Sequence, residues 1–162
     1  MFDLIRDGLG EIIEFPKLAV QCRSVRLVGT NEVVVRNADQ RRALRFTLRF
    51  DGNAGKEIFI GDGIVAATPF GSTGYYHSVT GTRFGKGIGL AFNNCTISHD
   101  PVILNEKCSV ELVVERSRAC VTVDNAPEII TVTPRDSISI TQAEESTRLL
   151  SHRQIPQGAE PK

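Results

Sequence analysis

The most constraining feature of this sequence is a succession of short apolar runs, rich in β-branched residues and separated by turn residues. The clearest run spans residues 43–50, where apolar and polar side chains alternate. Alternation with a period of two is typical of a strand that buries one face and exposes the other. Similar runs recur at spacings of roughly 8 to 12 residues, a pattern that predicts an all-β sandwich or barrel-like fold.

The predicted strands continue almost to the end of the chain. They comprise residues 11–15, 18–22, 24–28, 32–36, 43–50, 57–60, 64–67, 88–92, 101–104, 109–114, 119–123, 128–133, 137–141 and 148–150. Pro16 has no N–H to donate, which predicts an edge position or a break after the first run. Three consecutive valines in residues 32–36 predict a strand that is covered on both faces.

The length of 162 residues predicts one domain, because no repeat, low-complexity segment or linker divides the chain. We place this domain at residues 1–153, with a possible helical turn at residues 3–9. Residues 154–162 contain two prolines and lack an apolar pattern beyond Ile155, which predicts a flexible tail.

Charge and hydropathy argue against two classes of partner for this domain, nucleic acids and membranes. The 19 basic and 19 acidic residues cancel, so the chain has no overall field to attract nucleic acid or an anionic membrane. No apolar run approaches the roughly 20 residues of a membrane span, and residues 1–9 lack the apolar core of a signal peptide. We therefore expect a cytoplasmic protein with no nucleic-acid or membrane partner.

Four widely spaced cysteines include no C-x-x-C pair. This spacing predicts buried free thiols and no metal site.

The densest group of small polar residues is residues 68–78, which follow the apolar run 64–67. The pattern predicts a strand, a tight loop and a short helix, an arrangement that favours anions and polar ligands. The absence of a lysine argues against a Walker-type phosphate loop. Two interpretations remain open: the hydroxyl groups cap the helix, or they line a pocket in which Tyr75 and Tyr76 offer a flat surface to a ring.

Three other segments are candidates for chemistry. Asp62 lies between two glycines, in a phosphate- or metal-binding loop or at an ordinary hairpin end. Asn31 and Glu32 open the valine strand, as a ligand-binding pair or as a polar strand end. Residues 98–100 contain the three residue types of a hydrolase triad, but adjacent residues do not generally converge in that geometry.

Two longer segments resemble one known family. Residues 61–75 read G-D-G-I-V-A-A-T-P-F-G-S-T-G-Y, which is similar to the second signature of the NAD kinases, D-G-L-I-V-x-T-P-T-G-S-T-A-Y-S-x-S. Residues 30–35 resemble the L-N-E-V-V-I strand of that family, and residues 124–125 stand where it usually shows D-G-Q. Order and spacing agree from about residue 26 to residue 150. The resemblance implies the C-terminal domain of this family, a distorted β-sandwich with one short helix after the loop of residues 68–75.

The resemblance also implies binding of NAD(H) or a related nucleotide. The nucleotide-binding residues would be Asn31, Glu32, Asp62, Thr68, Ser72, Thr73, Gly74, Tyr75 and Ser78. In relatives the counterpart of Asp62 often reaches the dinucleotide from a neighbouring subunit, so the resemblance implies a homo-oligomer, a dimer or tetramer. Phe70 and Tyr76 replace smaller residues of the family pattern. Together with Phe92, these aromatic residues are possible modifiers of the pocket.

The family holds the phosphates of ATP and its metal in an N-terminal α/β domain with a G-G-D-G-T loop, which this sequence lacks. We therefore expect NAD to be a ligand or substrate, and ATP and Mg²⁺ to bind only if a partner domain supplies their site. The isolated chain would not catalyse phosphoryl transfer. Two alternatives remain: the acceptor-site subunit or a fragment of a two-component NAD kinase, and a non-catalytic scaffold with an occluded pocket.

Overall fold

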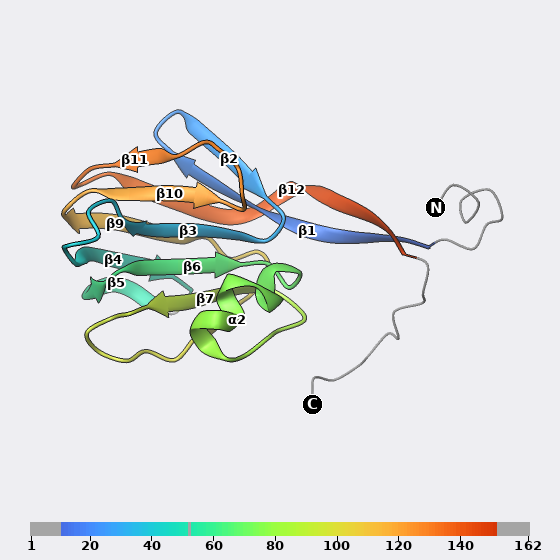
Figure 1. The fold of residues 1–162 in the computed structure, drawn as a ribbon, viewed down its shortest axis with the longest axis horizontal. Coiled ribbons are helices and arrows are strands. Elements are labelled where there is room, and N and C mark those ends of the chain that lie inside the picture. Colours follow the sequence, from blue (N-terminus) through green and yellow to red (C-terminus); the bar gives the residue numbers. More distant parts are fainter. Residues whose placement is uncertain (1–10, 52, 152–162) are drawn as a thin grey trace.

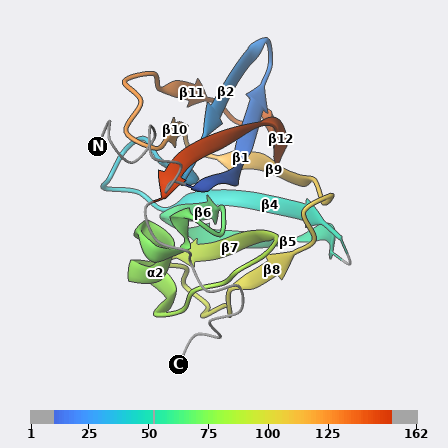
Figure 2. The ribbon, with the colours of Figure 1, turned by 90° about the vertical axis from the view of Figure 1, so that its right-hand side faces the viewer.

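Two antiparallel six-stranded sheets pack face to face in the computed structural model, which describes residues 11–51 and 53–151. The first sheet has the order β2-β1-β12-β9-β4-β5 (Figure 1), and the second has the order β11-β10-β3-β6-β7-β8, with β8 labelled in Figure 2. The first contains β1 (Glu11–Cys22), β2 (Val25–Gly29), β4 (Leu44–Phe50), β5 (Asn53–Gly61), β9 (Val110–Arg116) and β12 (Ser137–Ser151). The second contains β3 (Glu32–Asn37), β6 (Gly63–Ala67), β7 (Ile88–Asn93), β8 (Val102–Leu104), β10 (Ala119–Val123) and β11 (Ile130–Val132).

Two short helices follow β6, namely the 3-10 helix η1 (Gly71–Thr73) and α2 (Tyr75–Thr80). Figure 2 shows α2 beside β6 and β7. The predicted all-β sandwich is thus confirmed, as is the short helix after the loop of residues 68–75, with a 3-10 turn in front of it.

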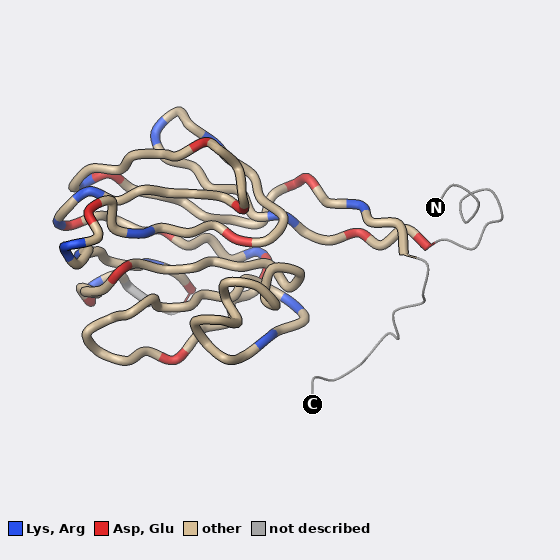
Figure 3. Tube along the Cα trace, viewed as in Figure 1, with Lys and Arg blue, Asp and Glu red and all other residues tan. Residues whose placement is uncertain are grey.

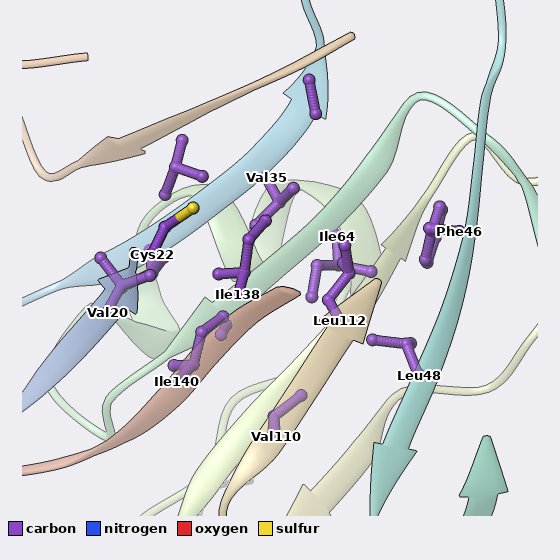
Figure 4. Close-up of a cluster of buried hydrophobic side chains, with 14 of the residues drawn as sticks. Val20, Cys22, Val35, Phe46, Leu48, Ile64, Val110, Leu112, Ile138 and Ile140 are labelled. Atoms are coloured by element: carbon purple, nitrogen blue, oxygen red, sulfur yellow. The ribbon is translucent and has the colours of Figure 1, made fainter. Parts of the chain in front are cut away.

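The main hydrophobic core lies between the two sheets, where inward-facing side chains of both interdigitate (Figure 4). In β4, Leu44, Phe46 and Leu48 are fully buried, as the alternation of the sequence predicts. A second, smaller cluster lies on the outer face of the second sheet, under α2. It consists of Val34, Val65, Ala67, Tyr76 and Ala91.

The valine strand β3 contributes to both clusters. Val33 and Val35 point into the main core, whereas Val34 points outward beneath α2. The prediction that residues 32–36 are covered on both faces is thus confirmed for the three valines, whereas Arg36 is exposed on the outer face. This arrangement also fixes which side chains of β3 face outward beside α2.

Two strands each join runs that the sequence pattern separates. β1 continues through Pro16 with a register shift between Pro16 and Leu18, and β12 joins two runs that we predicted as separate strands. Figure 1 shows these two strands extending together beyond the sandwich. Pro16 is tolerated because β2 pairs only with the part of β1 from Leu18 onward. Pairing with β1 keeps β12 extended where its own sequence is polar.

Charged residues of both signs are spread over the sandwich and the β1–β12 extension (Figure 3). Among the described residues, no helix is long and apolar enough to cross a membrane. All four cysteines are free, but only Cys22 is buried, so the prediction of buried thiols was wrong for the other three. The predicted helical turn at residues 3–9 and the predicted tail at residues 154–162 lie outside the described residues.

One ion pair ties the turn before β12 to the turn after β1. The Asp136 carboxylate pairs with Arg23 and accepts hydrogen bonds from the Thr133 hydroxyl, at 2.7 Å, and backbone N–H, at 2.8 Å. The Arg23 guanidinium, followed by these Thr133 bonds, lowers the pKa of Asp136 to about 2.

We predict that Asp136→Asn lowers the melting temperature at pH 7. A lowered pKa in the folded state stabilises the fold above the ordinary value near 3.8, and this contribution disappears as the pH falls towards about 2. The difference between the variant and the unaltered protein should therefore close over that interval in thermal unfolding curves. Asp100→Asn, at an exposed loop position, should leave the curves unchanged. A difference that persists at pH 2 would contradict the assignment.

Candidate functional site

The chain that enters β3 is held by a single carboxylate from the end of β10. Asp124 accepts hydrogen bonds from the backbone N–H groups of Thr30, at 2.7 Å, and of Asn31 and Glu32, both at 2.9 Å. Its own N–H donates to the Glu32 carbonyl at 3.0 Å. Asp124 therefore fixes the position from which Glu32 starts the strand.

The loop after β6 is tied to the same turn. The buried Thr68 donates its backbone N–H to the Asn31 carbonyl at 2.9 Å and its hydroxyl to the Thr30 carbonyl at 2.6 Å. That hydroxyl also accepts from the Gly71 N–H at 3.0 Å. A Cβ atom on Gly71 would lie 2.1 Å from the Asn31 oxygen, so this approach of the two backbones requires glycine.

The other hydroxyl groups of the loop also bind backbone. The buried Ser72 hydroxyl lies 2.7 Å from the Pro69 carbonyl and 3.2 Å from the Phe84 carbonyl. Thr73 and Ser78 each donate to the carbonyl three residues earlier. Neither helix has a side-chain hydrogen bond from its N-cap residue, but the Thr68 hydroxyl accepts the first N–H of η1, so the capping interpretation holds for η1 and not for α2. These hydroxyl groups stabilise the loop and its connection to Phe84.

A groove made of two adjoining hollows runs beside α2 on the outer face of the second sheet. The larger, the β10 hollow, has a volume of about 470 Å³. It is lined by Glu32, Val34, Arg36, Tyr75, Thr122, Asp124, Asn125, Ala126 and Ile129. The smaller, the β7 hollow, has a volume of about 310 Å³ and is lined by Arg36, Asn37, Gln40, Asp62, Tyr75 and Asn93. Arg36 and Tyr75 belong to both hollows.

Three of the nine predicted binding residues line this groove, namely Glu32, Asp62 and Tyr75. The other six do not line it: Asn31 lies in the turn before β3, Ser78 lies in α2, and the loop after β6 holds Thr68, Ser72, Thr73 and Gly74. Gly74 is the nearest of these, because a Cβ atom there would lie 3.7 Å from Glu32 Oε2. Two larger hollows, of about 530 Å³ each, contain none of the nine residues.

Sequence reasoning missed Arg36 and Gln40 as groove residues. The signal for Arg36 was present, because Glu32, Val34 and Arg36 alternate along β3 and therefore share its outer face. Gln40 lies in the loop after this strand and carries no such pattern.

The polar groups of the groove include several acceptors. The Glu32 carboxylate is half-buried, and no described residue donates a hydrogen bond to it; burial, and then the charge of Asp124, raises its pKa. Asp62 accepts from the Asn94 amide at 3.1 Å, and the Tyr75 hydroxyl accepts from the Asn93 amide at 3.0 Å. The groove can therefore accept hydrogen bonds from a ligand rich in hydroxyl groups.

The three aromatic residues considered as pocket modifiers line neither hollow. Phe70 packs against Phe15 of β1, with ring centroids 4.8 Å apart. Tyr76 is fully buried and meets the edge of Phe84 at 5.1 Å. Phe92 joins the main core, where its ring lies 5.2 Å from Phe59.

Room for the Tyr76 ring comes from a glycine on β7. A Cβ atom on Gly89 would lie 2.3 Å from the Phe84 ring and 2.8 Å from the Tyr76 ring. Burial raises the pKa of the Tyr76 phenol. Its bulk is thus accommodated between α2 and the sheet, outside the groove.

Two further observations concern the packing of His99 and the clustering of possible metal ligands. His99, from the segment with hydrolase residue types, packs against Phe59 and Phe92, with ring centroids 4.8 and 5.0 Å away. Within residues 11–51 and 53–151, no three His, Cys, Asp or Glu side chains gather in a way that could hold a metal ion.

Comparison with known proteins shows that the groove lies within a known protein domain. Residues 30–152 match the family described as the ATP-NAD kinase C-terminal domain, and every residue that lines the groove lies in this interval. The chain belongs to the NAD kinase family.

A curated relative in this family is the NAD kinase of Thermoplasma acidophilum. It is 31% identical over 160 residues, which cover 95% of this chain and 58% of the relative.

Two solved NAD kinase structures share the fold. The structure of yeast NADH kinase complexed with NADH gives a TM-score of 0.83 at 17% identity, covering 93% of this chain and 47% of that one. The NAD kinase from Archaeoglobus fulgidus in complex with ATP gives 0.73 at 21% identity, covering 93% and 59%. This chain thus spans less than two thirds of the length of each of these NAD kinases.

We predict that Asp124→Ala lowers the free energy of unfolding by about 2–3 kcal/mol, because it leaves three N–H groups without their charged acceptor. Asp124→Asn keeps one side-chain carbonyl oxygen and should lose clearly less. Urea unfolding followed by circular dichroism measures both variants. Equal stability of Asp124→Ala and the unaltered protein would show that the turn does not depend on this carboxylate.

Proposed function

We propose that this chain is the acceptor-nucleotide domain of an NAD kinase and binds NAD(H) in the groove beside α2. The observation that carries the proposal is the groove itself, in which Glu32, Asp62 and Tyr75 of the two NAD kinase motifs converge. The volumes of its hollows are in the range of small-molecule sites. A solved relative of the same fold is a kinase complexed with NADH.

The chemistry of the groove suits the parts of a dinucleotide. The carboxylates of Glu32 and Asp62 accept hydrogen bonds from ribose hydroxyl groups, which pair well with ionised acceptors. The Tyr75 ring, 38% exposed, offers a face to a base. Asp124, together with the backbone contacts of Thr68 and Gly71, holds these groups in place.

Within residues 11–51 and 53–151 the side chains do not fit a metal site, so we derive no phosphoryl-transfer step on them. Transfer to a ribose hydroxyl needs the phosphates of ATP, a metal ion and the acceptor to be positioned together. We propose that ATP and Mg²⁺ are held by a separate G-G-D-G-T domain.

The geometry favours ligand binding over the scaffold alternative. A scaffold with an occluded pocket required the large aromatic side chains to fill the site, and Phe70, Tyr76 and Phe92 line neither hollow. The acceptor-site subunit of a two-component kinase is compatible with the same groove, and the activity experiment below distinguishes it.

We further propose that residues 1–153 act as one domain with a flexible tail at 154–162, and that the protein works as a cytoplasmic dimer or tetramer. The resemblance to a family in which subunits share the dinucleotide site supports self-association. Ile129, 61% exposed at the wall of the β10 hollow, offers apolar surface there. Light scattering with and without NAD measures the mass.

We predict that calorimetry detects NAD binding and that Glu32→Gln weakens it about tenfold, through loss of a charged acceptor. The same variant should melt at a higher temperature at pH 7. Because burial raises the pKa of Glu32 in the folded state, its ionised form is unfavourable above that pKa, and removing the charge relieves the cost.

This gain in stability should vanish below about pH 4.5, where the carboxyl group is protonated in both states. Glu57→Gln, exposed on β5 of the other sheet, is the matched control and should change neither property. Undetectable heat with millimolar NAD would overturn the proposed function.

We predict that the purified chain with NAD, ATP and Mg²⁺ forms no NADP. Adding a polypeptide that carries the G-G-D-G-T domain should produce NADP if the chain is one component of a two-component kinase. Liquid chromatography measures the product. NADP formation by the chain alone would contradict the proposed division of the active site.

A further inference from the structure

The outer face of the second sheet has an open row at the centre of the groove. In the strand register, Arg36 of β3 lies opposite Gly63 of β6, and Gly63 lies opposite Asn93 of β7. Because neighbouring strands are about 4.8 Å apart, Arg36 and Asn93 stand roughly 10 Å apart with no side chain between them.

The gap in this row is a requirement of the backbone. Gly63 has φ +136°, and a Cβ atom there would lie 1.9 Å from the Val35 carbonyl oxygen. No other residue fits without moving β3. A ligand can therefore approach the sheet directly beside the Arg36 side chain.

Arg36 is an exposed cation whose charge is not neutralised by the protein. Among residues 11–51 and 53–151, no carboxylate lies within 4.0 Å of its guanidinium, and no hydrogen bond holds it. Other arginines at the surface, such as Arg23, Arg26 and Arg49, each pair with a carboxylate. The guanidinium of Arg36 is thus free to bind an anion in the groove.

The charges along the groove follow an order. The β10 hollow contains the Glu32 and Asp124 carboxylates, the β7 hollow contains the Asp62 carboxylate, and Arg36 borders both hollows between them. Carboxylates suit hydroxyl groups and disfavour phosphates, whereas a guanidinium binds phosphate oxygens through two parallel hydrogen bonds. The order is that of a molecule with a sugar at each end and an anionic centre.

We propose that Arg36 is the residue that binds the diphosphate of a dinucleoside diphosphate, with one nucleoside in each hollow. The assignment rests on the proposed function and deepens it, because it names the feature by which the groove selects a dinucleotide over its separate nucleosides. Arg36 is a positioning residue: its contact with the diphosphate sets how far each ribose enters its hollow.

The test compares ligands with and without the diphosphate. NAD binding is measured by calorimetry, and adenosine and nicotinamide riboside at millimolar concentration are measured by ligand-observed NMR. Arg36→Gln should weaken NAD binding about ten- to a hundredfold, as expected for a lost charged hydrogen bond, and leave both nucleosides within twofold. Arg36→Lys keeps the charge without the fork and should fall between.

The matched control is Arg45→Gln, an exposed arginine on β4 of the other sheet, which should change nothing.

Salt provides a second readout that a structural role would not move. The NAD affinity of the unaltered protein should fall as sodium chloride is raised from 50 to 500 mM, because salt screens the attraction between exposed charges. The NAD affinity of Arg36→Gln should fall less over the same range. Both variants should melt like the unaltered protein, because neither side chain has a partner among the described residues.

The outcomes separate the two proposals. If the unaltered protein binds NAD and Arg36→Gln binds it equally well, the role of Arg36 is wrong while the proposed function stands. Equal losses for NAD and the nucleosides would likewise refute a diphosphate contact. If the unaltered protein binds the nucleosides but gains nothing from the diphosphate, the groove is not a dinucleotide site. Absence of NAD binding to the unaltered protein overturns both.

Discussion

The rest of this structure depends on the hydrogen bonds that one carboxylate accepts from three successive backbone N–H groups. Asp124 holds residues 30–32, and the Asn31 carbonyl in turn receives the Thr68 N–H and the close approach of Gly71. Residues more than ninety positions apart thereby meet at one end of the second sheet. Each N–H that Asp124 satisfies would otherwise be costly to bury.

The groove lies on the part of the outer face of the second sheet that α2 does not cover. α2 covers the apolar rows of Val34, Val65 and Ala91, and beyond its edge the outward residues are polar. Small residues decide the shape: Gly89 admits the Tyr76 ring under α2, and Gly63 leaves the groove open beside Arg36. Phe70 and Tyr76 of the signature therefore pack away from the two hollows, whereas its Asp62 and Tyr75 line them.

Much of the fold could be predicted because strand patterning is local. The alternation in β4 and the valines of β3 appear in the structure as the sequence indicates. The extension formed by β1 and β12 could not be predicted, because residues 144–147 are polar and belong to a strand that pairs with β1. The roles of the loop hydroxyl groups were mispredicted for a related reason. Some of their hydrogen-bond partners, such as the Phe84 carbonyl, come close only when the chain folds.

For the candidate site, motif spacing was enough to identify the family and to select Glu32, Asp62 and Tyr75. It did not distinguish residues that line the groove from those that support it, since both kinds occur in the same motif. By itself, the sequence determined the all-β class, the two motifs and the polar residues they carry, because these depend on neighbouring positions. Only the tertiary structure decided that Asp124 holds the turn and that Arg36 stands between two hollows. Those roles depend on strand register and on contacts between distant segments.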